Sequence, residues 1–411
     1  MNTIARLEPT SLDDAARMVR ESTAAGLGVL PVGGATRMSP AASWASGGRE
    51  RIELRTRGLD KLIDLSPGDL TVSVEAGMTI AALETLLAPH GIRVPLDPPL
   101  ADGRATVGGM LATNDSGPLQ HSLGTARDFV IGMSILLADG TVIKAGGNVV
   151  KNVAGYDLHR LMVGSYGSLG LIAQVNFKLM PRPEAIRLLL LAPQSFAQAD
   201  TWTERLLSDR VRPALIDWLH PAPAEWNARA AANGEGPLLV VGFEGLREDV
   251  DGQVAWVERE FRGAAALDAE ASRARYELLR MRCIEAAQVR FRASVPSSRV
   301  AMSLQLLPPG VRVHVHAGAG VIHGSLKEWN GTQAAAGDPR ATGASGDREA
   351  SALLREFAEY VQRCRGWMKV QHADGCPMIV RSVSNAVGGL ERRLKQRLDP
   401  GGVFPNPPFL S

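Results

Sequence analysis

Cysteine is scarce in this sequence, and so are long apolar runs. The three cysteines, Cys283, Cys364 and Cys376, do not have the C-x-x-C spacing of an iron–sulfur or structural zinc site. No stretch approaches the roughly 20 apolar residues that a membrane-spanning helix requires. We therefore expect neither a membrane span nor a metal cluster. If this protein performs redox chemistry, its electrons must leave through an acceptor other than an iron–sulfur cluster of its own.

The net charge is small, and the common nucleotide-binding motifs are absent from the sequence. A net charge of +2, with no basic stripe between aromatics, argues against a nucleic-acid partner. Gly26-Leu27-Gly28 is not continued as G-x-G-x-x-G because Pro31 follows, and no P-loop motif occurs. The N-terminal residues MNTIARLEPTSLDD lack the apolar core of a secretory signal. These absences predict a cytoplasmic protein without a Rossmann or P-loop site.

A length of 411 residues predicts two or three domains, at about 100–200 residues each. Strands and helices alternate over the first 180 residues, which is typical of layered α/β or α+β folds. Ser11 precedes a helix of amphipathic spacing, Thr79 precedes another that Gly91 closes, and Asp139-Gly140 indicates a hairpin. The strands expected here are 29–32, 62–65, 70–75, 92–96 and 171–180.

The glycine-rich pattern ends at Pro181-Arg182-Pro183 and longer arginine-rich segments follow, which indicates a domain boundary. A second α+β region follows, with a Gly/Ala/Ser-rich surface loop at 330–347. We expect its strands at 188–191, 214–219, 237–243, 311–317 and 367–371, and its helices at 247–261, 272–289 and 348–365. The last helix is expected at 385–398.

Glycines recur between the short apolar runs of the first region, most densely from 103 to 172. Glycine has no Cβ, so it allows positive φ and the close approach of backbone to a ligand. The turn at 33–37 can form an anion-binding nest, to which Thr36 and Arg37 add donors, although a plain tight turn is the alternative. Together the loops predict one large, flat, anionic ligand.

These segments match a known family. Residues 9–182 resemble the FAD-binding domain of the vanillyl-alcohol oxidase, or PCMH, type. The resemblance rests on the turn at 33–37 and, in order, on VEAGMTIAALETLL, ATVGGMLATNDSG, GTARDFVIGMSILLADG, VKNVAGYDLHRLMVGSYGSLG and RLDPGGVFPN. Within the family, VVKNVAGYDLHRLMVG is most similar to FAD-binding subunits of bacterial glycolate oxidases, and D-lactate dehydrogenases come next. The implied fold is α+β: a two-subdomain FAD domain (1–183), an inserted α+β cap domain (184–370) and a segment (371–411) that returns to the FAD domain.

The resemblance implies one bound FAD. Its pyrophosphate would contact Gly33, Gly34, Ala35, Thr36 and Arg37. Its flavin ring and ribityl chain would lie along Thr106, Gly108, Gly109, Ser116 and Gly117. The site would be completed by Gly124, Ala154, Gly155, Tyr156, Gly170 and Ile172. Some relatives tether the flavin to a histidine or cysteine, whereas the first loop here has Ala35 and Met38, so we expect non-covalent FAD.

A histidine motif lies in the cap region. Hydroxy-acid dehydrogenases of the family carry H-x-G-D-G-N-x-H, and here His316 and His323 are kept while Ala319 and Val321 replace the Asp and Asn. Two imidazoles without a carboxylate make a poor metal site, so we expect no metal. The histidines either act as general base and substrate orienter or are structural. His314 would share the strand face of His316.

Arginines cluster between 273 and 299. They form either a solvated helix face or a docking surface for an acidic partner, and one of them could clamp a substrate carboxylate with two hydrogen bonds. Arg299, after Pro296-Ser297-Ser298, is the best clamp candidate. We list His316, His323 and Arg299 as candidate catalytic residues.

The function implied by the resemblance is oxidation of a short 2-hydroxy acid, glycolate to glyoxylate. The chain would act beside a sister FAD subunit and an iron–sulfur subunit, peripheral to the inner membrane through those partners. The altered histidine motif leaves alternatives open: an FAD electron-relay or assembly subunit, a stand-alone D-lactate-type dehydrogenase, or an interaction subunit that has lost FAD.

Overall fold

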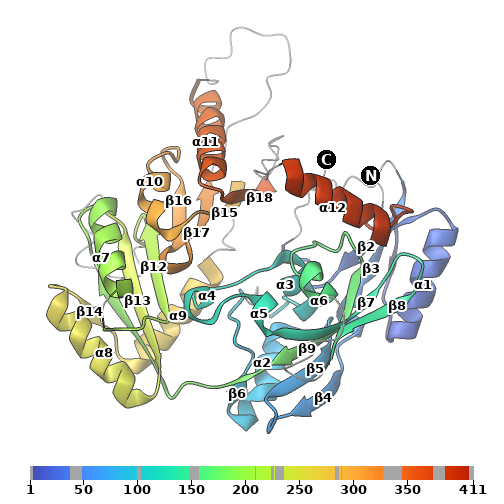
Figure 1. Cartoon of the computed structure of the whole chain (residues 1–411), viewed down its shortest axis with the longest axis horizontal. Coiled ribbons are helices and arrows are strands. Elements are labelled where there is room, and N and C mark those ends of the chain that lie inside the picture. The colour runs from blue at the N-terminus through green and yellow to red at the C-terminus, as the bar shows by residue number, and fades with distance from the viewer. Residues whose placement is uncertain are drawn as a thin grey trace.

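The computed structural model describes residues 3–37, 49–99, 103–147, 157–208, 210–223, 226, 236–282, 287, 289–326, 345–373 and 385–406. Two lobes lie side by side, one built from the N-terminal half of the chain and one from the following region (Figure 1). Each lobe has its own buried apolar clusters. The candidate site lies where the two lobes meet.

The first sheet of the N-terminal lobe has three parallel strands in the order β1 (Thr3–Leu7), β3 (Arg51–Arg55) and β2 (Gly28–Val32). Helix α1 (Leu12–Ala24) packs its apolar face on this sheet. The Ser11 hydroxyl accepts a hydrogen bond from the Asp14 amide (3.2 Å), so the predicted capped helix is confirmed. Strand β2 leads directly into the glycine turn at 33–37.

The second sheet of this lobe is antiparallel, in the order β4-β5-β9-β7-β8. Its strands are β4 (Leu62–Ser66), β5 (Thr71–Glu75), β9 (Leu171–Lys178), β7 (Val130–Leu136) and β8 (Val142–Gly146). The helices are α2 (Ile80–Leu87), α3 (Val107–Thr113), α4 (Gln120–Leu123), α5 (Ala126–Phe129) and α6 (Leu158–Met162). Gly140 has φ +80° in the turn between β7 and β8, which confirms the predicted hairpin.

The second lobe contains one eight-stranded antiparallel sheet, in the order β14-β11-β13-β12-β16-β17-β15-β18. The strands are β11 (Ala185–Leu191), β12 (Leu215–His220), β13 (Leu238–Gly245), β14 (Ala265–Ala266), β15 (Val289–Ser294), β16 (Arg312–His316), β17 (Val321–Leu326) and β18 (Trp367–Ala373). The chain enters it directly from a two-stranded pairing of β6 (Ile92–Arg93) with β10 (Met180–Pro181).

Four helices cover one face of this sheet, and one helix covers part of the other face. The first face packs against α7 (Phe196–Ser208), α8 (Arg247–Glu260), α10 (Val300–Leu304) and α11 (Ser345–Arg363). Helix α9 (Ala269–Arg282) packs against β11 on the opposite face. The rest of that opposite face, on β12, β16, β17 and β15, is directed toward the N-terminal lobe.

The sequence prediction of a helix over 272–289 is wrong at its C-terminal end. Helix α9 ends at Arg282, and residues 289–294 form β15. The alternation in VRFRAS explains the difference: Phe291 and Ala293 are buried in the helix-covered core, while Arg292 is on the other face. Strand β17 was not predicted. Its sequence is short and contains a glycine, so it carries no strong strand signal, and the strand forms by pairing with β15 and β16.

The C-terminal segment, α12 (Asn385–Leu398) and the residues after it, packs on the N-terminal lobe (Figure 1). The Lys395 ammonium donates to the carbonyl oxygens of Ser168 (2.7 Å) and Phe404 (2.9 Å) and pairs with Asp399. The Asp399 carboxylate accepts from the Val403 and Phe404 amides (2.8 and 2.9 Å). This buried network joins the last residues to the loop before β9.

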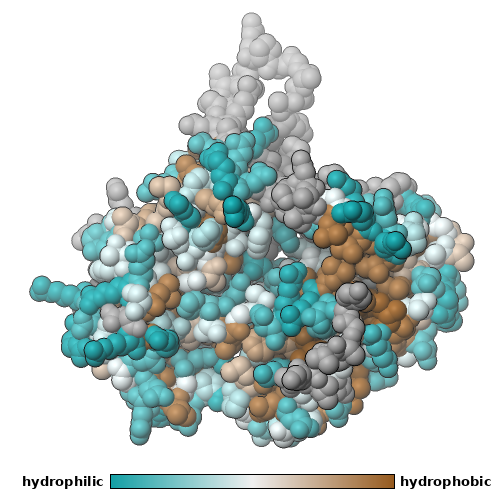
Figure 2. Space-filling model, viewed as in Figure 1, coloured by the Kyte–Doolittle hydropathy of each residue, from teal (hydrophilic) through white to brown (hydrophobic). Residues whose placement is uncertain are grey.

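Polar contacts also join the lobes. Arg93 forms two hydrogen bonds to Glu244 (2.5 and 3.0 Å), and the Tyr276 hydroxyl donates to Asp97 (2.9 Å). Figure 2 shows a surface that is hydrophilic over α8 and α11 and hydrophobic over part of the N-terminal lobe below α12. In the described ranges, none of the helices has the length and apolar character of a membrane-spanning segment.

Candidate functional site

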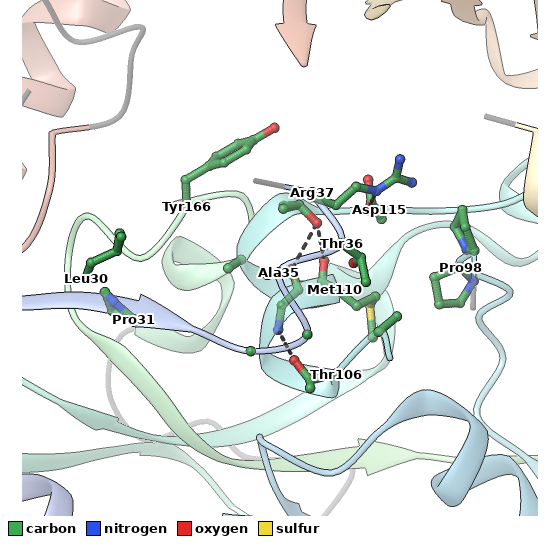
Figure 3. A pocket seen from close by; sticks show the side chains of 17 residues that line it. Leu30, Pro31, Ala35, Thr36, Arg37, Pro98, Thr106, Met110, Asp115 and Tyr166 are labelled. Atoms are coloured by element: carbon green, nitrogen blue, oxygen red, sulfur yellow. Dashed lines mark hydrogen bonds and ion pairs between the residues drawn. The ribbon is translucent and has the colours of Figure 1, made fainter. Parts of the chain in front are cut away.

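A cavity of about 700 Å³, partly open to solvent, lies in the N-terminal lobe. Its walls come from the end of β2 with the turn after it, from a loop at 98–99, and from α3 with its flanking residues (Figure 3). The lining residues are Leu30, Pro31, Gly33, Gly34, Ala35, Thr36, Arg37, Pro98, Pro99, Ala105, Thr106, Gly109, Met110, Ala112, Thr113, Asp115 and Tyr166. The first predicted loop and part of the second thus face one space.

Gly33 and Gly34 are required by close packing of the turn. A Cβ on Gly34 would lie 1.8 Å from the Arg104 carbonyl oxygen, and one on Gly33 would lie 2.2 Å from the Thr106 hydroxyl oxygen. Ala35 adopts φ +53°, a left-handed conformation that costs energy for a residue with a Cβ. The turn therefore exposes backbone to the cavity, and the space that side chains at 33 and 34 would need is occupied by residues 104–106, which precede α3.

Thr106 organises the opposite wall. Its hydroxyl accepts a hydrogen bond from the Gly109 amide (3.1 Å) and caps α3. Gly109 lines the cavity, whereas a Cβ on Gly108 would lie 3.1 Å from Ala76, beneath the helix. Gly109 therefore faces the ligand space, and Gly108 lets α3 lie close to the five-stranded sheet.

Tyr166 covers one end of the cavity (Figure 3). Its backbone is left-handed (φ +56°) and its amide donates to the Ala112 carbonyl (2.8 Å). The ring packs with Leu30 and Val32 of β2. A non-glycine residue kept in this conformation is often found at a functional site.

Arg37 lies at the rim, not deep in the turn. Its Nε bonds to the Asp115 carboxylate (2.5 Å), and the two side chains are 12% and 8% exposed. Figure 3 shows both on the same side of the cavity as Tyr166. The Arg37 charge acts on His323 of the second lobe, where it lowers the imidazole pKa. Arg37 lines the cavity, and its predicted contact with the pyrophosphate stays a prediction.

Buried polar atoms near the cavity test whether a polar cofactor fits. Among the described residues, no group hydrogen-bonds to Asn114 Oδ1, Ser116 Oγ or Ser165 Oγ, although all three are buried. Buried polar atoms are nearly always satisfied, so these three are suited to a ligand or to water. Together with the backbone at 33–35, which lines the cavity, these atoms next to the lining residues are suited to a polar ligand.

Other predicted cofactor residues have structural roles in the lobe. The Gly117 amide donates to Asp97 (3.1 Å), and a Cβ there would lie 2.1 Å from the Asp97 carbonyl oxygen. Gly124 has φ +93° at the end of α4, above Asp128. Gly170 packs on Ile135, and Ile172 is in the core of the sheet. Ala154, Gly155 and Tyr156 lie outside the described residues.

A row of polar side chains crosses the eight-stranded sheet, called the cap sheet below, on the face that is directed toward the N-terminal lobe. His316 is opposite Asp217 of β12, and His314 is opposite both Leu219 of β12 and His323 of β17. The ring centroids are 4.6 Å apart for His314 and His316, 5.2 Å for His316 and His323. Asp217, His314, His316 and His323 are all buried. The short distances show that the structure brings the predicted histidines His316 and His323 together with His314.

Asp217 is the residue that sequence reasoning missed. Its carboxylate contacts His314 Nε2 (2.7 Å) and His316 Nδ1 (2.9 Å), and its side chain is 0% exposed. Burial alone would raise its pKa, but His316 and His314 outweigh burial and hold the pKa at about 2. The premise that no carboxylate accompanies the histidines is therefore wrong. The one signal in the sequence was a single acid inside an apolar strand, LIDWLH.

His323 is kept neutral. Burial lowers its pKa well below the usual value, and His316, Arg292, His314 and Arg37 lower it further. Within the described part of the chain, neither ring nitrogen of His323 has a hydrogen-bond partner, and His316 Nε2 has none either. The row thus presents imidazole nitrogens that a ligand can engage.

Arg292 and Lys369, on the same sheet as this row, contact residues of the N-terminal lobe next to the cavity. Arg292 Nη1 donates to the carbonyl oxygen of Asn114 (2.7 Å) and Nη2 to Gln120 (3.3 Å), at the end of α3 and the start of α4. The Lys369 ammonium of β18 lies 4.9 Å from the centre of the Tyr166 ring. The polar face of the cap sheet therefore meets the N-terminal lobe next to residues that line the cavity.

Arg299 does not join this row. It is exposed in the 3₁₀ turn Ser297–Arg299, and its charge acts on Tyr360 of α11, a helix on the other face of the sheet. The substrate clamp at Arg299 stays a prediction, and Arg292 is the arginine that contacts the N-terminal lobe beside the histidine row. The signal for Arg292 was the arginine alternation in VRFRAS, which was interpreted as part of a helix.

The comparisons with known proteins agree with this geometry. Residues 4–146 match a family model described as an FAD binding domain. The chain is 41% identical over 124 residues to glycolate oxidase subunit GlcE of Escherichia coli, covering 30% of this chain and 35% of that protein. It is 28% identical over 213 residues to glycolate oxidase subunit GlcD of Bacillus subtilis, covering 52% and 44%. The chain thus spans less than half the length of these curated relatives.

A solved structure shows the same fold over nearly the whole chain. Alkyldihydroxyacetonephosphate synthase superposes with a TM-score of 0.66 at 18% identity, covering 97% of this chain and 75% of that one. The predicted α+β, PCMH-type fold is confirmed. Residues 4–146 therefore carry an FAD-binding domain, and FAD is the cofactor of this domain.

Proposed function

We propose that this protein is an FAD-dependent oxidoreductase that oxidises a short 2-hydroxy acid, with glycolate as the first substrate to test. One observation carries the proposal: His316 and His323 are buried imidazoles whose nitrogens lack hydrogen-bond partners among the described residues, and Arg37, which lines the cavity, acts electrostatically on His323. FAD, when bound, accepts the hydride that leaves the substrate α-carbon. The names of the glycolate oxidase relatives support the substrate class.

The N-terminal lobe would hold the cofactor. The backbone of 33–36 and the α3 wall at Thr106 and Gly109 would contact it along the cavity, and Ser116 Oγ supplies an unsatisfied polar atom nearby. We propose non-covalent binding. The cavity-facing side chains at 35 and 36 are alanine and threonine, which have no imidazole or thiol for a flavin bond.

The cap residues would hold the substrate and move its proton. His316 Nε2 would accept the hydroxyl proton while the α-hydrogen leaves with its electron pair. The positive charge of Arg292, which acts on His323, favours a bound carboxylate at this place. Because the row is buried, water is excluded and these charges act strongly on the substrate.

We propose that the electrons leave through a partner. The relatives' names describe subunits, which supports an assembly of more than one subunit. We propose a sister FAD subunit and an iron–sulfur subunit as the partners. Association with a membrane would then come from that assembly.

A second candidate function is favoured by one observation. Ala319 and Val321 stand where the family motif has Asp and Asn. In this alternative, the chain holds FAD for electron relay, and a sister flavoprotein oxidises the substrate.

Anaerobic mixing separates the two functions. Glycolate, D-lactate and larger 2-hydroxy acids are added to the FAD-loaded chain, and flavin absorbance is followed. Direct oxidation predicts rapid bleaching, slowed about 10²- to 10⁴-fold in His316→Gln, which is the usual contribution of a general base. The matched control, His90→Gln, changes an exposed histidine and should bleach as the wild type does. Bleaching only after a sister subunit is added would contradict direct oxidation and support relay.

A further inference from the structure

We propose that Asp217 is a positioning residue that fixes the tautomer of His316, so that Nε2 carries the lone pair directed at the substrate. Its role in proton transfer rests on the proposed function, whereas the tautomer does not. Asp217 is on β12, outside the histidine motif, and acts only through the two imidazoles that it contacts.

The Asp217 carboxylate determines which nitrogens of the two imidazoles carry hydrogen. With its pKa at about 2, Asp217 is ionised at neutral pH and can only accept hydrogen bonds. Both ring nitrogens that face it must therefore carry hydrogen: Nε2 of His314 at 2.7 Å and Nδ1 of His316 at 2.9 Å. A neutral imidazole has one N–H, so neutral His316 bears its lone pair on Nε2.

The second histidine makes the arrangement rigid. Each oxygen of Asp217 is used by a different imidazole, His314 on Oδ2 and His316 on Oδ1. Rotation of the carboxylate would break both contacts. The sheet register, with His316 directly opposite Asp217, fixes the backbone of the pair as well. His314 is thus the second support of the carboxylate, and His316 is left to face the substrate.

The distances favour hydrogen bonds over a shared cation. The three potential ligand atoms lie within 4.8 Å of one another, which a divalent ion could use. Two ligands of a tetrahedral ion with bonds of about 2.1 Å would lie about 3.4 Å apart. The oxygen–nitrogen separations of 2.7 and 2.9 Å are shorter and have the length of direct hydrogen bonds.

The direct test is the tautomer itself. The FAD-loaded protein is labelled with ¹⁵N-histidine, and long-range ¹H–¹⁵N spectra are recorded at a pH where the imidazoles are neutral. Signals are assigned with His314→Gln and His316→Gln. We expect the Nδ1–H form for His316 and the Nε2–H form for His314. A wild-type His316 that is protonated at Nε2 would overturn the proposal without any enzyme assay.

Asp217→Asn supplies the perturbation. An amide offers one acceptor and one donor group, so it cannot accept from both imidazoles, and at least one histidine must change tautomer. We expect flavin reduction to slow about 10²- to 10⁴-fold, with substrate affinity and FAD content nearly unchanged. Asp249→Asn, an exposed change on α8, is the control. Unchanged tautomers and an unchanged reduction rate in Asp217→Asn would contradict the proposal.

The outcomes separate the two proposals. If the tautomers are as expected but no 2-hydroxy acid bleaches the flavin, the proposed function fails and the assignment of Asp217 stands. If Asp217→Asn does not fold, the wild-type spectrum and His314→Gln still decide. His314→Gln should keep the His316 tautomer, because the Oδ1 contact remains. A stoichiometric divalent ion that co-purifies and whose removal shifts both histidine signals would overturn the proposal in favour of a metal site.

Discussion

At the scale of single residues, small side chains at a few positions decide whether the cofactor cavity exists. Gly34 is the most constrained, because its missing Cβ would collide with backbone, which cannot move aside as a flexible side chain can. Gly33 meets a side chain, the Thr106 hydroxyl, that also caps α3. Both glycines therefore serve the shape of the cavity wall.

Gly34→Ala should therefore weaken FAD binding at least tenfold. The turn would have to move away from the Arg104 carbonyl and into the cavity. FAD retained after gel filtration, or titrated by fluorescence, measures the effect. Gly68→Ala is the matched control, since nothing lies within 4 Å of its added Cβ. Equal FAD affinity in the two variants would show that the turn at 33–37 does not shape the site.

The neutral state of His323 predicts a pH dependence of stability. Its folded pKa is lowered well below the ordinary value near 6.5, so below that pH the unfolded chain binds a proton that the folded chain does not. Its contribution to stability is thus present above pH 6.5 and is lost as pH falls, by about 1.4 kcal/mol per pH unit.

Urea unfolding of wild type and His323→Gln between pH 5 and 7 measures this slope. The variant should show a slope smaller by about one proton. Identical slopes would mean that His323 titrates normally in the folded protein.

At the scale of elements, patterns within one segment predicted the structure well, and contacts between segments were not predictable. The capped helix after Ser11 and the hairpin at Asp139-Gly140 depend on neighbouring residues, and both were found from the sequence. Strand β17 and the position of Asp217 depend on pairing between strands far apart in the chain, which no local pattern encodes. The glycine turn at 33–37, which lines the cavity, was predicted because its glycines are neighbours in the sequence. Asp217, which contacts the histidines from another strand, was not predicted.

Helix α12 provides a prediction at this scale. Burial lowers the pKa of Lys395, while its hydrogen bond and ion pair with Asp399 raise it. Asp399→Asn should leave a buried charge without its counter-ion and cost about 3–5 kcal/mol of unfolding free energy. Lys395→Met with Asp399→Asn should cost less than the two single changes summed. Additive effects in this double-mutant cycle would show that the pair does not anchor α12.

At the scale of the whole molecule, the proposed function depends on the junction between the two lobes. The N-terminal lobe supplies the cavity, and the cap sheet supplies the polar row. Arg292 connects them, because it donates to Asn114 and Gln120 of the first lobe and lowers the pKa of His323 in the second.

Arg292→Met should therefore weaken substrate binding more than FAD binding. It should also raise the pKa of His323, since a nearby positive charge is removed. Substrate affinity from flavin bleaching and the ¹⁵N shift of His323 measure the two effects. Arg259→Met, on exposed α8, should change neither. Loss of FAD with unchanged substrate affinity would place Arg292 in the cofactor site instead.

The most direct measurement of the central claim is a crystal structure of the FAD-loaded protein with oxalate, an unreactive analogue of a 2-hydroxy acid. The account predicts FAD along the cavity at 33–37 and α3, with oxalate held between the flavin ring and His316 and contacting Arg292. Oxalate bound elsewhere, or a flavin ring remote from the histidine row, would contradict it.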